Sequence, residues 1–402
     1  MHIALLVKDF AVGEKFSKDG LPTKSGAEFH AENHARQLIA RGHRVTIFAK
    51  KRHFYTKARE NLDGIDLVRL HEPSRGTELL LRLLTTHRDV DAVYIIGTPK
   101  FAVWAILWGR FLHKPVTLAL TAKMEIFAAK ANWRNRIFAR CTNFIATTHE
   151  IQAGFREQGG VAPERISVLA HGIDTARYTM PTQEEKEALR RAAGLAGDAH
   201  ILLFCARIVR NKGIDTLLRI WPIVHLADPA ARLLVVGGGK HELMQELRDM
   251  AATLDGSAII LGEVDKPDSY YRMADVYVFP SHHEALPTSL LEAMSSGLPS
   301  VVSDIGGCDD LIFDDETGCR VPTEDAEAFA ARILELFRAE PKRLAMGKTS
   351  RALVQRMCDY TFVAPRLEAI IRSRTPCGKD DLQPHGNVQE EMAGHGCADR
   401  IQ

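Results

Sequence analysis

Two glutamates separated by seven residues form the most specific chemical pattern in the sequence. Glu284 lies in a short loop after an apolar run, and Glu292 follows within SHHEALPTSLLEAMSSGLPSVVSD, residues 281–304. Proline suits the first position of a helix, so Pro287 places Glu284 in the loop before a helix and Glu292 on that helix, and the eight residues from one glutamate to the other correspond to about two helical turns. Backbone N–H groups at the helix start can then bind an anion between the two carboxylates.

A carboxylate, a group of amides and a second carboxylate suit a ligand that contains a sugar, a diphosphate and a ribose. Carboxylates accept hydrogen bonds from hydroxyl groups, while the helix terminus holds phosphate. The alternative is an ordinary capped helix whose two acids face solvent. The predicted ligand contacts of this segment are Glu284, Ala285, Leu286, Pro287, Thr288 and Glu292.

Two cations follow a second apolar run, in CARIVRNKGID at residues 205–215. Arg207 comes at the end of a predicted strand, and Lys212 precedes Gly213 and a predicted helix. Ligands of open α/β sheets bind outside the carboxyl ends of the strands, where such cations can neutralise a diphosphate. Each cation taken alone is more typical of a solvated surface than of a ligand site, so the prediction rests on both lying at the same sheet edge as Glu284.

A glycine run and one loop residue complete the predicted donor site in the second half of the chain. Gly237 and Gly238 follow a strand in VVGGGKHE and permit a ligand to approach the backbone closely, although a tight turn explains them equally well. The run lacks the spacing of a dinucleotide or P-loop motif. Val264 follows the next strand, where the backbone can contact a nucleobase.

In the first half, a Ser-Gly turn leads into an amphipathic helix. Ser25 and Gly26 are predicted to present their amides toward a ligand. His30 and His34 lie four residues apart on this helix, but no nearby acidic partner completes a metal site. They are interpreted as helix-face histidines, and His282 and His283 are likewise not taken as metal ligands.

Short apolar runs that alternate with longer amphipathic segments must position these residues. Strands that are apolar throughout and separated by helices indicate parallel sheets covered on both faces. Two such blocks predict two doubly wound α/β domains that face each other. The predicted strands are 2–7, 44–49, 67–71, 92–97, 116–120, 143–147, 166–169, 201–205, 233–236, 258–261, 276–279 and 300–303, and the predicted first-half helices are 27–40, 79–87, 102–112 and 134–141.

The charge distribution supports a division into two domains. Residues 1–178 carry 27 Lys and Arg against 17 Asp and Glu; of the totals of 52 and 51, this leaves 25 basic and 34 acidic residues for the rest. The predicted domains are 1–178 and 179–373, with the last helix, about 362–373, expected to pack back on the first domain. Residues 374–402 lack periodicity and are predicted to be disordered.

Composition excludes several classes of protein. Of the 402 residues, 46% are hydrophobic and 26% charged, which is typical of a globular protein. No apolar stretch is long enough to span a bilayer, and the first residues are typical of a strand, not of a signal peptide. The seven cysteines are scattered without a C-x-x-C pair, so a reducing, cytoplasmic compartment is predicted. Nucleic acid is not an expected partner, because the sequence has neither zinc-finger spacing nor a basic tail.

The combined motifs closely resemble the family 4 retaining glycosyltransferases of the GT-B fold. The resemblance rests on Arg207 with Lys212-Gly213, on Gly237–Gly239, and on Glu284-x7-Glu292 with Gly297-Leu298-Pro299 after it. SGAE at residues 25–28 and HGID at residues 171–174 also fit. The likeness covers about residues 1–373, and its most specific part is the pair of glutamates.

The resemblance implies a reaction and a role for each residue. Members transfer a sugar from a nucleotide-diphosphate donor, keep the anomeric configuration and need no divalent metal or other cofactor. By this resemblance Arg207 and Lys212 stabilise the leaving diphosphate, Glu284 holds donor-sugar hydroxyls and Glu292 binds the ribose. Ser25 and Gly26 face the donor phosphate and the acceptor from the opposite domain. The donor carrier, UDP or GDP, is left open.

The chain departs from the family pattern at two places. Many members have a histidine after the strand that corresponds to residues 116–120, where this chain has Thr121 and Lys123; both are assigned to the sugar or acceptor side. The family's EGFG-like loop is here Glu284-Ala285-Leu286-Pro287, which lacks a glycine.

Two alternatives and a possible partner remain open at this point. A sugar-nucleotide 2-epimerase of the same architecture shares the donor site but needs no acceptor, and a non-enzymatic carbohydrate-binding protein is the other alternative. The acceptor is a glycan, a lipid-linked molecule or a small molecule with a hydroxyl group. The apolar run 101–108 and the basic segment 127–140 suit peripheral contact with an anionic membrane at its cytoplasmic face, with a buried and a solvated helix as the alternative.

Overall fold

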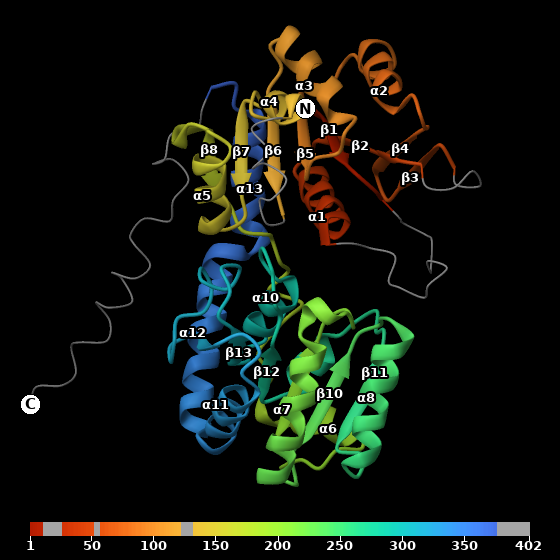
Figure 1. The fold of residues 1–402 in the computed structure, drawn as a ribbon. Coiled ribbons are helices and arrows are strands. Elements are labelled where there is room, and N and C mark those ends of the chain that lie inside the picture. The colour runs from red at the N-terminus through yellow and green to blue at the C-terminus, as the bar shows by residue number, and fades with distance from the viewer. Residues whose placement is uncertain (11–25, 52–56, 122–131, 376–402) are drawn as a thin grey trace, which may run out of the picture.

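Two β-sheets, one in each half of the chain, form the framework of the molecule (Figure 1). The computed structural model describes residues 1–10, 26–51, 57–121 and 132–375. Strands up to Val168 belong to the first sheet, and strands from Ile201 onward belong to the second. The predicted class, α/β with two doubly wound sheets, is confirmed.

The first sheet has eight strands within the described residues, and its order reverses beside its first strand. All neighbouring strands are parallel except β3 and β4. Later strands are added on one side of β1 up to β4 and on its other side from β5. The order across the sheet is β3 (Arg59–Leu62), β4 (Ile65–Leu70), β2 (Arg44–Lys50), β1 (His2–Val7), β5 (Ala92–Ile96), β6 (Val116–Leu120), β7 (Asn143–Ala146) and β8 (Ile166–Val168).

Helices cover both faces of this sheet, which explains why its strands are apolar throughout. One face packs against α1 (Gly26–Ala40) and α13 (Tyr360–Arg372), and the other packs against α2 (Arg75–Leu84), α3 (Ala102–Phe111), α4 (Trp133–Phe138) and α5 (His149–Glu157). The histidines of α1 are buried instead of facing solvent. Burial lowers the pKa of His30 to about 3 and that of His34 to about 4, and the His30 ring stacks on the ring of His171.

The second sheet has six strands, all parallel, within the described residues. Its order is β11 (Ala258–Gly262), β10 (Arg232–Val236), β9 (Ile201–Cys205), β12 (Val276–Phe279), β13 (Ser300–Ser303) and β14 (Gly318–Val321). Two apolar clusters fill its faces. The covering helices are α6 (Gln183–Ala192), α7 (Ile214–Ala227), α8 (His241–Thr253), α9 (Asp268–Met273), α10 (Thr288–Ser295), α11 (Ala326–Arg338) and α12 (Glu340–Cys358).

Each predicted strand is present, with bounds that differ by at most two residues, but two strands were not predicted. β3 has the polar sequence RENL and pairs antiparallel with β4 at the sheet edge, so the first sheet is not parallel throughout. β14 is a four-residue edge strand that begins with a glycine. Edge strands need little apolar sequence because one side of their backbone is unpaired, and the apolar pattern therefore missed both.

The chain crosses between the two halves twice, and the crossings lie side by side. Ile173 and Asp359 form an isolated parallel bridge, and Thr175 Oγ1 donates to Asp359 Oδ2 at 2.6 Å. A Cβ on Gly172 would lie 2.3 Å from the ring of Tyr360, so the second position of HGID has no room for a side chain. After this crossing, α13 packs against α1 and β5 of the first half (Figure 1).

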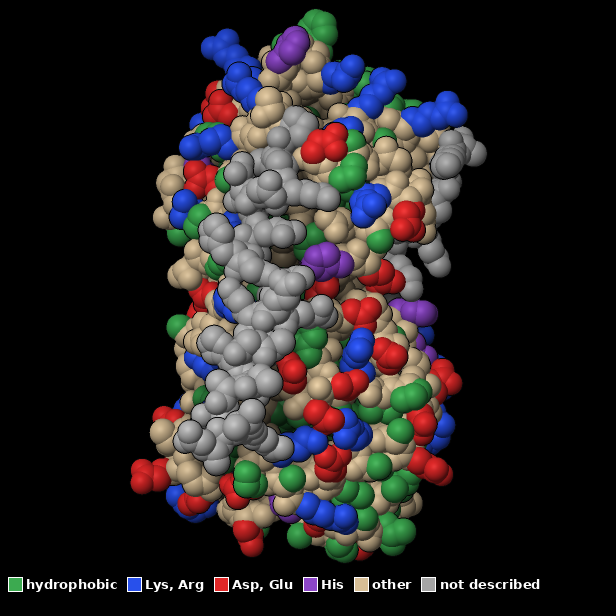
Figure 2. Space-filling view, turned by 90° about the vertical axis from the view of Figure 1, so that its left-hand side faces the viewer, with side chains coloured by type: hydrophobic (Ala, Val, Ile, Leu, Met, Phe, Trp, Pro, Cys, Tyr) green, Lys and Arg blue, Asp and Glu red, His purple; other side chains and the backbone are tan. Residues whose placement is uncertain are grey.

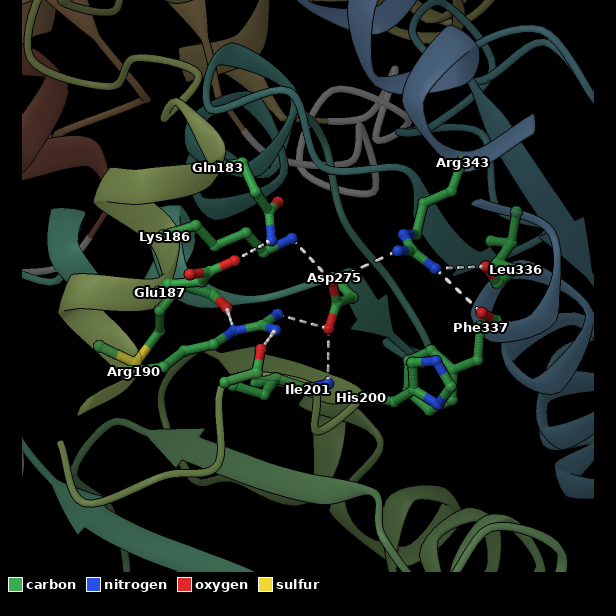
Figure 3. Close-up of polar contacts among 12 residues, drawn as sticks. Gln183, Lys186, Glu187, Arg190, His200, Ile201, Asp275, Leu336, Phe337 and Arg343 are labelled. Carbon is green, nitrogen blue, oxygen red and sulfur yellow. Dashed lines mark hydrogen bonds and ion pairs between the residues drawn. The ribbon is translucent and has the colours of Figure 1, made fainter. Parts of the chain in front are cut away.

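A buried carboxylate joins several elements at the edge of the second sheet where the strands begin (Figure 3). Asp275 immediately precedes β12 and accepts hydrogen bonds from Lys186 Nζ and Arg190 Nη2 at 2.6 Å and from the Ile201 N–H at 2.8 Å. Arg343 Nη2 lies 3.7 Å from Asp275 Oδ1. Burial alone raises the pKa of this carboxyl, but the surrounding cations outweigh that effect and lower it. The cluster links α6, β9, β12 and α12.

Candidate active site

The carboxyl ends of β9 and β12 meet where the second sheet reverses its order. β9 pairs with β10 on one side and with β12 on the other. Arg207 and Lys212 follow β9, whereas Glu284 follows β12. A crevice opens at such a reversal because the two connections leave the sheet in opposite directions. The fold therefore brings predicted residues from two distant segments to one edge of one sheet.

Lys212 and Glu284 are in direct contact. Lys212 Nζ forms an ion pair with Glu284 Oε1, and both side chains are 14% exposed. Ser281 Oγ lies 2.9 Å from Glu284 Oε1, and the Lys212 ammonium lies 5.5 Å from the centre of the Phe279 ring. An anionic ligand can compete with Glu284 for Lys212 and leave the carboxylate to accept hydrogen bonds from hydroxyl groups. Ser281 was not predicted because a lone serine carries no distinctive signal.

Three successive glycines hold the loop that carries Arg207. The Ile208 N–H donates to Gly238 O at 2.9 Å. Gly237 has φ +141°, and a Cβ there would lie 1.9 Å from the carbonyl oxygen of Ala206. The glycines therefore allow the two loops to lie against each other. The Arg207 side chain is exposed and forms no ion pair or side-chain hydrogen bond within the described part of the chain, so its guanidinium is available.

Glu292 is held by two tyrosines. Tyr178 OH donates to Glu292 Oε1 at 2.9 Å, and Tyr271 OH donates to Glu292 Oε2 at 2.7 Å. Burial raises the pKa of the Glu292 carboxyl, although both hydrogen bonds act in the opposite direction. Each carboxylate oxygen keeps acceptor capacity for a further hydroxyl group. The sequence did not indicate the tyrosines, because they lie 114 and 21 residues from Glu292.

The segment between the two glutamates presents its backbone more than its side chains. α10 begins at Thr288, and Pro287 is its N-cap instead of its first residue. The side chains of Ala285 and Leu286 are buried, and Ala285 packs into the core of the first half. A ligand can therefore meet these two residues only through their backbone groups. Val264 is half-buried and lies two residues beyond β11.

Two of the predicted site residues of the first half lie within the described residues. Gly26 is exposed and begins α1, and Thr121 is half-buried directly after β6. Ser25 and Lys123 lie outside the described residues, as do residues 376–402 of the predicted disordered tail.

A cavity of about 400 Å³ lies beside Glu284 between the two halves. Glu150 from α5 lines it on one side, and the segments 282–284, 304–306 and 323–324 line it on the other. A Cβ on Gly306 would lie 2.4 Å from Glu150 Oε2, so the two halves approach closely here. The lining carboxylates suit a ligand rich in hydroxyl groups and disfavour one that is itself anionic.

One wall of this cavity contains a histidine between two carboxylates. His282 Nε2 lies 3.4 Å from Asp215 Oδ1, and His282 Nδ1 lies 3.3 Å from Glu324 Oε1. The three groups offer ligand atoms within 4.8 Å of one another, a spacing that a metal ion tolerates. A protonated imidazole can pair with both carboxylates through its two nitrogens, so this geometry does not require a metal ion.

A second contact between the halves is expected to depend on pH. His149 Nδ1 lies 2.7 Å from Asp310 Oδ1, and this hydrogen bond raises the pKa of His149. The ionic contribution is therefore fully present below the unfolded pKa of histidine, about 6.5, and is lost as pH rises through the raised pKa. His149→Gln should lower the melting temperature at pH 5.5 and change it little at pH 8.5. Because the imidazole is 61% exposed, the effect should stay below about 1 kcal/mol. An equal loss at both pH values would contradict this account.

Comparison with known protein families agrees with the geometry. The sequence model described as "Glycosyl transferases group 1" matches residues 185–353, and the one described as "Glycosyltransferase Family 4" matches residues 24–177. The first covers the strands and loops that carry Arg207, Lys212 and Glu284. The second covers most of the first sheet and its helices.

Similar proteins are found both by sequence and by structure. A GDP-mannose-dependent monoacylated α-(1-6)-phosphatidylinositol monomannoside mannosyltransferase of Corynebacterium glutamicum is 29% identical over 51% of this chain and 55% of its own length. CapM, a capsular polysaccharide biosynthesis glycosyltransferase of Staphylococcus aureus, is 23% identical over 73% of this chain and 79% of its own. This chain thus spans about half the length of the first of these relatives.

Among solved structures, sucrose-phosphate synthase of Thermosynechococcus elongatus matches with a TM-score of 0.74 and 20% identity, over 92% of this chain and 98% of the other. Anabaena HepE in complex with UDP matches with a TM-score of 0.72 and 18% identity, over 92% of this chain and 99% of the other. At these identities the structural likeness concerns the fold. The two family matches together cover most of the chain and show that it belongs to the family 4 glycosyltransferases of the GT-B fold.

Proposed function

We propose that the protein is a retaining glycosyltransferase that moves a neutral hexose-type sugar from a nucleotide-diphosphate donor to a hydroxyl acceptor. The observation that carries the proposal is the ion pair of Lys212 with Glu284 at the reversal point of the second sheet, where Arg207 follows the same strand as Lys212. One relative is named for GDP-mannose and one structural neighbour was solved with UDP, so UDP and GDP are the proposed carriers.

The donor diphosphate is proposed to lie between the two cations and the start of α10. Breaking the bond between sugar and phosphate develops negative charge on the diphosphate, and Arg207, Lys212 and the backbone N–H groups near Thr288 favour that state. Glu292 receives the ribose hydroxyls, with Tyr178 and Tyr271 fixing its carboxylate. These cations supply the charge that a metal ion supplies elsewhere, so we propose that no metal is required.

The donor sugar is proposed to occupy the cavity beside Glu284. Its carboxylates can accept hydrogen bonds from several sugar hydroxyls, while they would repel a uronic acid. The preference for a neutral sugar rests on this lining. By the family resemblance, the donor's own phosphate takes the acceptor proton, and closing the cleft keeps water from the reacting bond.

We propose that the two halves of the chain bind different substrates. Residues 179–373 bind the donor, and residues 1–178, with Gly26 and Thr121 near the cleft, bind the glycan, lipid-linked or small-molecule acceptor. The five cysteines within the described residues are unpaired and buried, which supports a reducing compartment such as the cytoplasm.

Ligand-induced stabilisation tests the donor assignment. At a hundredfold excess over its Kd, the correct nucleoside diphosphate should stabilise the protein by about 2.7 kcal/mol, which corresponds to a rise in melting temperature of about 5–10 °C for a domain of this size. A thermal-shift screen of UDP, GDP, ADP and CDP measures it, with the nucleosides as controls. If no diphosphate raises the melting temperature above its nucleoside, the proposed donor site is wrong.

Transfer itself is tested with the donor that this screen selects. A glycosylated acceptor with retained anomeric configuration, seen by NMR, supports the proposal, and EDTA should leave the rate unchanged. Conversion of the donor sugar to an isomer without any acceptor would instead show an epimerase. Strict dependence on added magnesium or manganese would contradict the metal-independent mechanism.

A further inference from the structure

Exposed large apolar side chains gather on three neighbouring helices of the first half. Most of the large apolar side chains that are exposed in the described part of the chain belong to α2, α3 and α4. The side chain of Phe111 is 81% exposed and that of Trp133 is 63% exposed. α3 contacts α2 on one side and α4 on the other, so the side chains form one face. This apolar face consists of Leu81, Leu84, Trp104, Leu107, Phe111, Leu112 and Trp133.

Apart from Arg110 in its last turn, the central helix of the apolar face is hydrophobic on all sides. Trp104, Leu107 and Phe111 are spaced three and four residues apart and share the outward side of α3. Val103 and Ile106 on its inward side are buried in the core of the first half. A helix that is apolar all round is normally enclosed, and this one is enclosed on one side only. Contiguous exposed patches of this kind mark binding surfaces.

The described residues around this face are mostly basic, and the acidic Glu78 on α2 is paired with Arg82. Between Asp91 and Glu150 the described residues include no Asp or Glu. Arg110, Arg136 and Arg140 are exposed and form no ion pair with another described residue. Figure 2 shows Lys and Arg side chains gathered at the end of the molecule that the first half forms.

A basic cavity adjoins the apolar face. It has a volume of about 370 Å³, lies between the end of α3 and the start of β6, and has no acidic residue in its lining. Such a cavity attracts an anion of the size of a phosphate group. Its charged or titratable lining residues are Arg110, His113, Lys114, Arg140 and Arg374.

We propose that the apolar face lies on an anionic lipid bilayer and that the basic cavity receives a lipid headgroup phosphate. Apolar side chains beside unpaired arginines are the combination that binds a protein to the surface of such a membrane. α3 has ten residues, and no helix in the described ranges is long and apolar enough to cross a bilayer, so the contact is peripheral. The contact itself does not depend on catalysis; its use, to bring the proposed acceptor-binding half to a lipid-linked acceptor, rests on the proposed function.

Vesicle flotation tests the contact without an activity assay. The full-length protein should float with vesicles of phosphatidylglycerol and phosphatidylcholine, and much less with phosphatidylcholine alone. Phe111→Ser should weaken the partition coefficient about tenfold, and Arg136→Gln about fivefold. The matched controls are Leu226→Ser, which replaces an 85% exposed leucine on α7, and Arg248→Gln, which replaces an exposed arginine on α8; both should bind as the wild type does.

Several outcomes would overturn the proposal. They are failure of the wild type to float with anionic vesicles, equal binding to neutral ones, or equal losses in the control variants. A Phe111→Ser variant that turns a dimer into a monomer in light scattering, without vesicle binding by the wild type, would assign the face to a second copy of the chain. Displacement from vesicles by millimolar glycerol phosphate at constant ionic strength supports headgroup binding in the cavity, and no displacement overturns that part. Thermal shift with the selected nucleoside diphosphate verifies that each variant is folded.

Discussion

Replacing Lys212 by alanine is expected to lower the kcat of sugar transfer by about 10²–10³-fold, the loss typical of removing one group that stabilises transition-state charge. Lys212 is held at the mouth of β9 by Glu284 and by the ring of Phe279, so it is already placed for a departing diphosphate. Glu284→Ala should lower kcat at least as strongly, because it removes the proposed sugar contact and the partner of Lys212. Since the two residues pair, the double variant should lose less than the product of the single losses.

The neighbouring Arg210 offers a matched control for this prediction. It lies in the same turn as Lys212 but points to Glu246 on α8, with its Nη2 3.2 Å from Glu246 Oε1. Arg210→Ala should therefore retain nearly the wild-type rate. Steady-state kinetics with a saturating donor, together with circular dichroism to verify the fold, measure all variants. A Lys212→Ala enzyme with wild-type kcat would refute its role.

Replacing Asp275 by asparagine is expected to lower the free energy of unfolding by about 3–5 kcal/mol, because it leaves buried cations without their counter-charge. Lys186, Arg190 and Arg343 all converge on this carboxylate, whose side chain is 3% exposed (Figure 3). Urea denaturation followed by circular dichroism measures the loss.

A surface cluster with similar chemistry serves as the control for Asp275. Asp315 also pairs with two cations, Arg332 and Lys342, but its side chain is 52% exposed. Asp315→Asn should cost less than about 1 kcal/mol because water screens exposed ion pairs. Similar losses in both variants would contradict the role of burial.

The pH dependence of the Asp275 effect has a definite sign. Because the folded pKa is lowered, the ionised carboxylate stabilises the protein fully above the unfolded pKa of aspartate, about 3.9, and this stabilisation is lost as pH falls through the lowered folded value. The difference between wild type and Asp275→Asn should thus stay constant from pH 8 to about 5 and shrink below 4. A difference that grows toward low pH would contradict the assignment.

The fold was predictable because its strands are buried on both faces. Apolar runs such as those of β6, β9 and β12 are visible without knowledge of their neighbours, and their alternation with helices indicates parallel sheets. The edge strand β3 was not predicted, because its residues are polar and it pairs only with β4, the next strand in the chain. The contact of Lys212 with Glu284 was predictable because chain order in a doubly wound sheet places the ends of β9 and β12 together.

The remaining parts of the site depend on side chains that only tertiary packing brings together. Tyr178 and Tyr271 lie on either side of Glu292, and nothing in their own segments indicates a carboxylate partner. The same holds for Glu150, which reaches the cavity beside Glu284 from the other half of the chain. The burial of Ala285 was not predicted either, because it results from packing of its loop against the core of the first half, which the loop sequence does not indicate.

We propose that a nucleotide diphosphate lies between Arg207 and Lys212. Calorimetric titration with the nucleoside diphosphate and with the matching monophosphate tests it most directly, because the two ligands differ by one phosphate group. The wild type should bind the diphosphate more tightly than the monophosphate. Arg207→Ala and Lys212→Ala should each reduce this preference about 10–100-fold, the loss expected for one charged hydrogen bond, while the affinity for the monophosphate stays nearly constant. An unchanged preference in both variants would contradict the account.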